Sequence, residues 1–174
     1  MATMVSTANT VSPILQEFRN EAAITKRLLD RVPADKLTWK PHAKSMTLGQ
    51  LAGHIASIPG GISKLVQQES FDVLKGSFVP AQPSSLEQIL ATLDQGVSEA
   101  DQFLQGFDEE SAAATFRLMK GDREVFCQPR AVTVRTIMLN HWYHHRGQLS
   151  VYLRLLDVPL PVIYGRSADT DPFA

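Results

Sequence analysis

Apolar residues recur at the 3.6-residue period of an amphipathic helix in four stretches of the chain. The first runs over residues 10–32 and ends at Pro33, where a helix must stop. The second opens at Thr47, which forms a capping-box pattern with Gln50. Its apolar positions are Leu48, Leu51, Ala52, Ile55, Ile58, Ile62 and Leu65. Pro59 predicts a kink or an interruption in this helix, because proline lacks an N–H and clashes with the preceding turn.

Two more helical stretches lie in the second half of the chain. One starts near Ser84 or Ser85. Its apolar positions are Leu86, Leu90, Leu93, Val97, Ala100, Leu104 and Phe107. The last begins soon after Pro129 and runs to about Asp157. One face of it is formed by Val134, Met138, His141, His145, Leu149, Tyr152 and Leu156.

The connections between these stretches complete the predicted fold. Residues 71–83 are polar and contain prolines, and they are long enough for a crossover. Residues 116–126 resemble a short hairpin that turns at Gly121 and Asp122. With no internal repeat or interdomain linker, residues 1–174 are expected to form a single domain. The prediction is all-α: a four-helix bundle with a long crossover and a small hairpin-like insert between its third and fourth helices.

Composition and charge act mainly by excluding classes of function. The 17 Lys and Arg residues nearly balance the 18 Asp and Glu residues, so the chain lacks a basic surface for nucleic acid or an anionic membrane. No apolar run approaches the roughly 18 residues of a membrane span. The first residues lack the pattern of a signal peptide, and the single Cys127 excludes an intrachain disulfide or a cysteine zinc cluster. We expect a cytoplasmic protein that binds neither nucleic acid nor membrane.

Three of the five histidines fall on apolar faces of two predicted helices. His141 and His145 are four residues apart, the spacing of two ligands of one metal ion on a helix. His54 lies on the apolar face of the second helix, where a lone histidine is more often a hydrogen-bonded core residue. If the bundle brings these two helices together, the three imidazoles meet around one point. A shared metal site and a set of hydrogen-bonded core histidines are then the two alternatives.

The remaining candidates for chemistry carry weaker signals. His144 lies about 100° around the helix from His145, which favours a supporting or interhelical hydrogen bond. His42 is in a predicted loop, where a surface role is expected. Cys127, in a predicted loop before Pro129, is a candidate nucleophile if a histidine lies nearby. Phosphate-loop, dinucleotide-binding, nucleophile-elbow and HExxH motifs do not occur.

Three residues directly after the histidine pair also need a role. Arg146 and Gln148 are expected to bridge helices, and the alternative is that they face a substrate. Gly147 within a helix costs about 1 kcal/mol relative to alanine. We therefore expect another backbone to approach closely at Gly147.

Two segments of the sequence resemble the DinB/YfiT-like family, the damage-inducible protein family. They are Trp39-Lys-Pro-His-Ala-Lys-Ser-Met-Thr-Leu-Gly-Gln-Leu-Ala-Gly-His54-Ile and His141-Trp-Tyr-His-His145-Arg-Gly-Gln-Leu-Ser-Val-Tyr-Leu-Arg154. The resemblance covers nearly the whole chain and implies a four-helix bundle with a long crossover. Carried over by position, it implies a divalent metal bound by His54, His141 and His145. An imidazole-only set suits Zn, Ni or Fe.

The same resemblance implies a class of reaction. Some relatives are thiol S-transferases that use low-molecular-weight thiols such as bacillithiol or mycothiol, and one branch isomerises maleylpyruvate with a thiol cofactor. A metal with three imidazole ligands keeps an open position. A thiol there becomes a nucleophile. The expectation is thiol transfer to a small electrophilic substrate, and the alternatives are a metal-dependent hydrolase or a non-catalytic metal-binding or damage-response bundle.

Apolar side chains near the end of the chain exceed what one helix face needs. A second set on the last helix is Ile137, Trp142, Val151 and Leu155, and further apolar residues are Leu153, Leu156 and residues 158–163. Exposed apolar patches beyond a few hundred Å² usually mark an interface. We expect a homodimer with a two-fold axis, as the resemblance also implies. In the alternative, the hairpin and the C-terminal tail cover this surface and leave a monomer.

Overall fold

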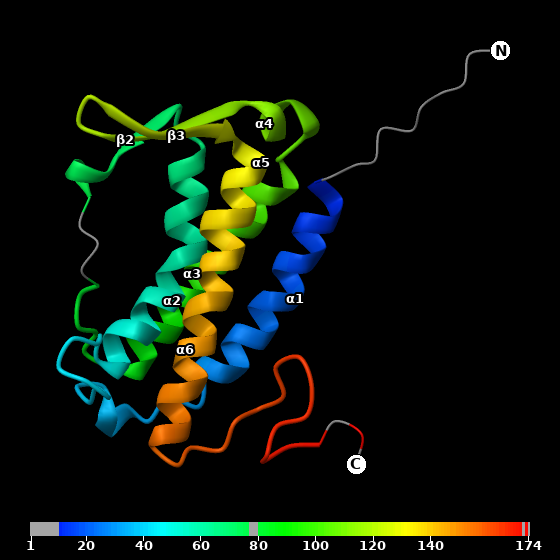
Figure 1. Ribbon diagram of the computed structural model, residues 1–174. Coiled ribbons are helices and arrows are strands. Elements are labelled where there is room, and N and C mark those ends of the chain that lie inside the picture. The colour runs from blue at the N-terminus through cyan, green and yellow to red at the C-terminus, as the bar shows by residue number, and fades with distance from the viewer. Residues whose placement is uncertain (1–10, 77–79, 172, 174) are drawn as a thin grey trace.

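Four long helices pack side by side in the computed structural model, which describes residues 11–76, 80–171 and 173 (Figure 1). They are α1 (Val11–Leu29), α2 (Leu48–Val66), α3 (Leu86–Gln105) and a composite last helix of α5 (Arg130–Thr133), a π-helical segment (Val134–Asn140) and α6 (His141–Leu155). α3 contacts α1 and α2, and α6 contacts α2 and α1, which closes the bundle. The four helical stretches expected from periodicity are therefore confirmed, with ends that differ by a few residues.

A three-stranded sheet lies across one end of the bundle and corrects the all-α expectation (Figure 1). The strands β2 (Thr115–Lys120) and β3 (Arg123–Pro129) form the expected antiparallel hairpin between α3 and the last helix. Its turn contains Gly121, whose φ of 59° suits glycine. The third strand, β1 (Ser70–Asp72), pairs in parallel with β2. Three residues are too few to show the alternation of apolar and polar side chains that marks a strand, so β1 could not be predicted from the sequence.

Short helical turns connect the main elements. Two 3-10 turns cover Ala34–Lys36 and Val73–Lys75, and the short helix α4 covers Glu109–Ala113. The long connection between α2 and α3 holds β1 and the second 3-10 turn. Asp72 accepts hydrogen bonds from the N–H groups of Leu74 and Gly121, both at 3.0 Å. These bonds tie the connection to the turn of the hairpin.

α2 is one uninterrupted helix, so of the kink or interruption expected at Pro59 the interruption is wrong. A proline removes the N–H that would bond the carbonyl four residues earlier, here Ile55. That carbonyl instead accepts a 2.9 Å hydrogen bond from the indole Nε1 of Trp142. At Gly60 the helix lies against α3, where an added Cβ would come within 2.9 Å of the Gly96 Cα.

Buried polar contacts join the last helix to α1 and to the C-terminal tail. The guanidinium of Arg146 is 2% exposed and forms an ion pair of 2.5 Å with Glu21. It also donates to Thr25 at 3.1 Å and to the hydroxyl of Tyr164. Arg146 therefore bridges elements, as expected. No helix within the described ranges is long and apolar enough to cross a membrane.

Candidate metal centre

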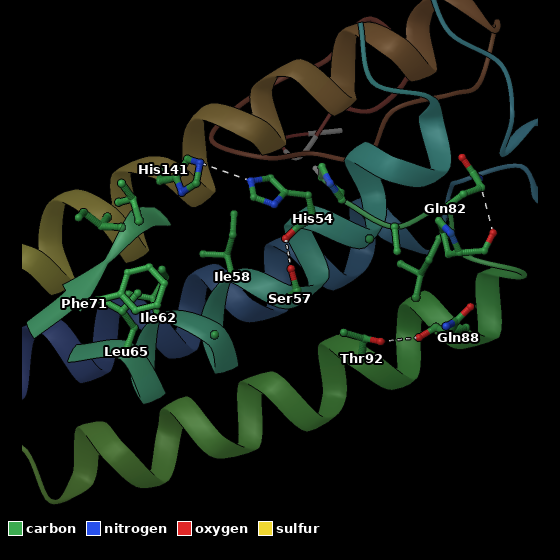
Figure 2. A pocket seen from close by; sticks show the side chains of 18 of the residues that line it. His54, Ser57, Ile58, Ile62, Leu65, Phe71, Gln82, Gln88, Thr92 and His141 are labelled. Atoms are coloured by element: carbon green, nitrogen blue, oxygen red, sulfur yellow. Dashed lines mark hydrogen bonds between the residues drawn. The ribbon is translucent and has the colours of Figure 1, made fainter. Parts of the chain in front are cut away.

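The imidazoles of His54, His141 and His145 meet between α2 and α6. Figure 2 shows His54 and His141 facing one another across the two helices. Their Nε2 atoms are 3.4 Å apart, and those of His141 and His145 are 2.8 Å apart. One nitrogen from each of the three rings lies within 4.8 Å of the others. The bundle thus brings the three histidines close enough to hold a single metal ion.

Local structure places each of these histidines. The side chains of Thr47 and Gln50 form the expected capping box at the start of α2, and His54 follows two turns into that helix. The π-helical segment ends immediately before His141. π-helical turns are rare and often occur at functional sites, because they change which residues share a helix face. His145 then follows one turn along α6.

Two of the rings have hydrogen-bond partners that orient them. The Nδ1 of His145 lies 2.7 Å from Oε1 of Gln148, an atom that accepts hydrogen bonds from an N–H. His141 forms a hydrogen bond with the backbone of Ile137. A histidine that donates from Nδ1 leaves the lone pair of Nε2 free to bind a metal. Gln148 therefore contacts His145 on its own helix, in place of the expected bridge between helices.

Burial lowers the pKa of all three imidazoles. For His54 the pKa falls to about 4, first because of desolvation and then because of the neighbouring His145 and His141 rings. Burial also lowers the pKa of His141, against the opposing hydrogen bond with Ile137. The pKa of His145 is lowered by burial, and its bond with Gln148 opposes the shift. All three rings are therefore neutral at pH 7, which is the form that binds metal.

The cluster formed by the described residues offers three possible ligands. Among the described residues, no further His, Cys, Asp or Glu joins the cluster formed by His54, His141 and His145. Three protein ligands with an open position are typical of catalytic zinc sites, whereas structural sites are closed by a fourth. Imidazole donors also fit Ni and Fe. The donor set therefore fits a divalent metal that has room for an exogenous ligand.

The other candidate residues lie outside this cluster. His144 is exposed and only packs its ring against that of His145, with 4.9 Å between the centroids. His42 is exposed, and its Nδ1 accepts from a neighbouring backbone N–H at 3.1 Å. Cys127 is exposed on β3 and not in a loop as expected. The close backbone approach expected at Gly147 is wrong, because an added Cβ would meet nothing within 4 Å.

A cavity of about 530 Å³ adjoins the histidines and was missed by sequence reasoning (Figure 2). Both His54 and His141 belong to its wall. The other lining residues are Gly53, Ser57, Ile58, Gly61, Ile62, Leu65, Phe71, Val73, Pro80, Ala81, Gln82, Pro83, Gln88, Ile89, Thr92, Leu118 and Ile137. They come from α2, α3, the long connection, β2 and the π-helical segment. No local pattern could have grouped residues from elements so far apart in the chain.

Comparison with known proteins agrees with this architecture. A DinB-like protein from Bacillus cereus ATCC 10987 superposes with a TM-score of 0.68 at 22% identity, over 90% of this chain and 98% of that one. A DinB-like protein from Bacillus subtilis, YjoA, gives 0.67 at 17% identity, over 89% and 99%. No curated protein sequence matches the chain. The sequence profile of the DinB family matches residues 4–171, so the chain belongs to the DinB family.

Proposed function

We propose that this protein is a metal-dependent enzyme that transfers a low-molecular-weight thiol to a small electrophile. The carrying observation is that His54, His141 and His145 converge without a fourth protein ligand among the described residues, at the wall of a cavity. A divalent metal bound by these residues supplies positive charge that favours the thiolate form of a thiol. The proposed location is the cytoplasm.

The residues of the chain have distinct roles in this proposal. Gln148 and the backbone of Ile137 hold the imidazoles of His145 and His141. The cavity wall holds the electrophile beside His54 and His141. In the reaction, a bond forms between sulfur and carbon as the bond to the leaving group breaks. The leaving group takes the electron pair, and the thiol proton passes to solvent.

A hydrolase is the second candidate because the same open coordination position can take water. A divalent metal held by the three histidines would lower the pKa of water, which is the chemistry that a hydrolase needs near neutral pH. The two candidates differ in one requirement, since only the transferase needs a thiol. A closed structural site would need a fourth ligand, and the described residues place none in the cluster.

Metal content tests the ligand set. Protein purified without a polyhistidine tag or chelators should contain about one divalent metal per chain by elemental analysis. The triple variant His54→Ala, His141→Ala, His145→Ala should lose it. Variants His42→Ala and His144→Ala are matched controls and should keep it. Unchanged metal content in the triple variant would refute the site.

Turnover tests the reaction. Metal-loaded protein is offered a panel of thiols with 1-chloro-2,4-dinitrobenzene, and separately a 4-nitrophenyl ester without thiol. Thiol-dependent release of chloride that stops when the metal is removed supports the transferase. Ester cleavage that requires metal but no thiol identifies a hydrolase instead. No metal-dependent turnover in either assay contradicts both candidates.

A further inference from the structure

We infer that the molecule held in the cavity beside His54 and His141 is uncharged and largely apolar. This inference rests on the proposed function for the reaction that the molecule undergoes, but its binding stands on the cavity alone. It assigns the cavity to the electrophile and leaves the charged part of the thiol outside.

The first observation is the absence of charge from the cavity wall. None of the described lining residues is Asp, Glu, Lys or Arg. In Figure 2, Ile62, Leu65 and Phe71 gather on one side of the histidines. A carboxylate or phosphate that entered would lose its water of hydration and find no counter-ion in the wall. An apolar molecule would instead remove apolar surface from water, which favours binding.

The second observation is that the polar side chains in the wall already have partners within the protein. The hydroxyls of Ser57 and Thr92 donate to backbone carbonyls of their own helices, at 2.9 Å to His54 and 2.8 Å to Gln88. The side-chain amide of Gln82 donates to the Leu37 carbonyl at 3.2 Å. Oε1 of Gln88 accepts from the Ser84 N–H at 2.8 Å. These bonds hold the side chains to the fold. The hydroxyl protons of Ser57 and Thr92 are therefore engaged within the fold, and a ligand is recognised mainly by the histidine cluster and by apolar contact.

The third observation is the size of the cavity relative to the two reactants. About 530 Å³ is in the range of cavities that bind small organic molecules. Thiols derived from cysteine carry carboxylate or ammonium groups. The described residues of the cavity wall offer no counter-ion for either group. The electrophile is the reactant that can be apolar throughout. The cavity therefore selects among electrophiles by charge.

Binding of two matched probes tests this selection. Methyl 2-naphthoate and 2-naphthoate differ in charge and little in shape, and each is titrated calorimetrically into chelator-treated protein at pH 7.5. Without metal, the carboxylate has no ion to bind. We expect the neutral ester to bind at least about tenfold more tightly, because burying the anion is unfavourable. Equal or tighter binding of the carboxylate, or no binding of the ester, overturns the inference.

Two variants place the binding in this cavity. Gly61 lines it, and an added Cβ there meets nothing within 4 Å, so Gly61→Phe is chosen to place a ring at the cavity. It should abolish ester binding, whereas the control Gly61→Ala should retain it. Ile62→Lys puts a cation in the wall and should shift the preference toward the carboxylate. Ester affinity unchanged in Gly61→Phe would show that the molecule binds elsewhere.

The outcome is separable from that of the proposed function. Selective binding of the ester without any metal-dependent turnover would uphold the inference and contradict the proposed enzyme. Metal-dependent turnover together with tighter binding of 2-naphthoate would support the proposed enzyme and contradict the inference.

Discussion

The indole Nε1 of Trp142 donates a 2.9 Å hydrogen bond to the carbonyl of Ile55, and both residues directly follow a proposed metal ligand in the sequence. Trp142 follows His141 on α6, and Ile55 follows His54 on α2. The carbonyl is available because Pro59 has no N–H to give it. The bond therefore aligns α6 with α2 at the level of the histidines. Proline in α2 and tryptophan in α6 act together in positioning the site.

Removing this bond should weaken both the fold and metal binding. Trp142→Phe keeps an aromatic ring beside Phe18, on which Trp142 stacks at 5.7 Å, but leaves the carbonyl without its donor. We expect a loss of about 1–3 kcal/mol in the free energy of unfolding, measured with urea. Metal affinity should fall as well. Trp39→Phe, which changes a tryptophan in the loop before α2, is the control and should leave metal affinity unchanged. Wild-type metal affinity in Trp142→Phe would contradict the aligning role.

The contact between Gln148 and His145 should control metal affinity. Gln148→Leu removes the acceptor of the Nδ1 proton while preserving much of the side-chain volume. Loss of such a partner typically lowers metal affinity about 10–100-fold. The control Gln148→Glu retains an acceptor and should bind metal closer to wild type. Competition with a chromophoric chelator measures both. Equal affinity in all three proteins would show that the bond does not orient the ring.

Stability of the metal-free protein should fall with acidity between about pH 6.5 and pH 4. The pKa of His54 drops to about 4 on folding, and those of His141 and His145 also drop, so the unfolded chain binds more protons in this window. Stability then rises with pH through the window and is lost as pH falls. Urea unfolding of chelator-treated protein at several pH values measures the effect. His54→Gln removes one of the three groups and should show a shallower decline, whereas parallel curves would contradict the prediction.

The homodimer remains a prediction, and the structure narrows the surface that it would use. Trp142 is fully buried rather than exposed, and Val158, Leu160 and Ile163 are partly buried and packed against the core. Val151 and Leu155 on α6 are each 57% exposed. If they form the interface, light scattering should give twice the chain mass of 19.2 kDa. The double variant Val151→Asp, Leu155→Asp should then give one chain mass. A wild-type mass near 19.2 kDa at micromolar concentration would establish a monomer.

The sequence by itself determined the four helices, because their periodicity and caps depend on residues within a few positions of one another. The capping box of Thr47 and Gln50 and the turn at Gly121 are local in the same sense, and both are confirmed. The pairing of His141 with His145 also followed from one turn of helix. His54 joined them only on the assumption that two helices meet.

Tertiary structure decided the features that depend on distant partners. β1 exists because Ser70–Asp72 meets β2, and three residues alone carry no periodic signal. α2 continues through Pro59 because Trp142, far along the chain, satisfies the carbonyl of Ile55. Trp142 is buried, so it does not belong to the exposed apolar surface that was expected from the sequence. The cavity is likewise built from separate elements, since its shape depends on how helices, strands and connections pack and not on any one segment.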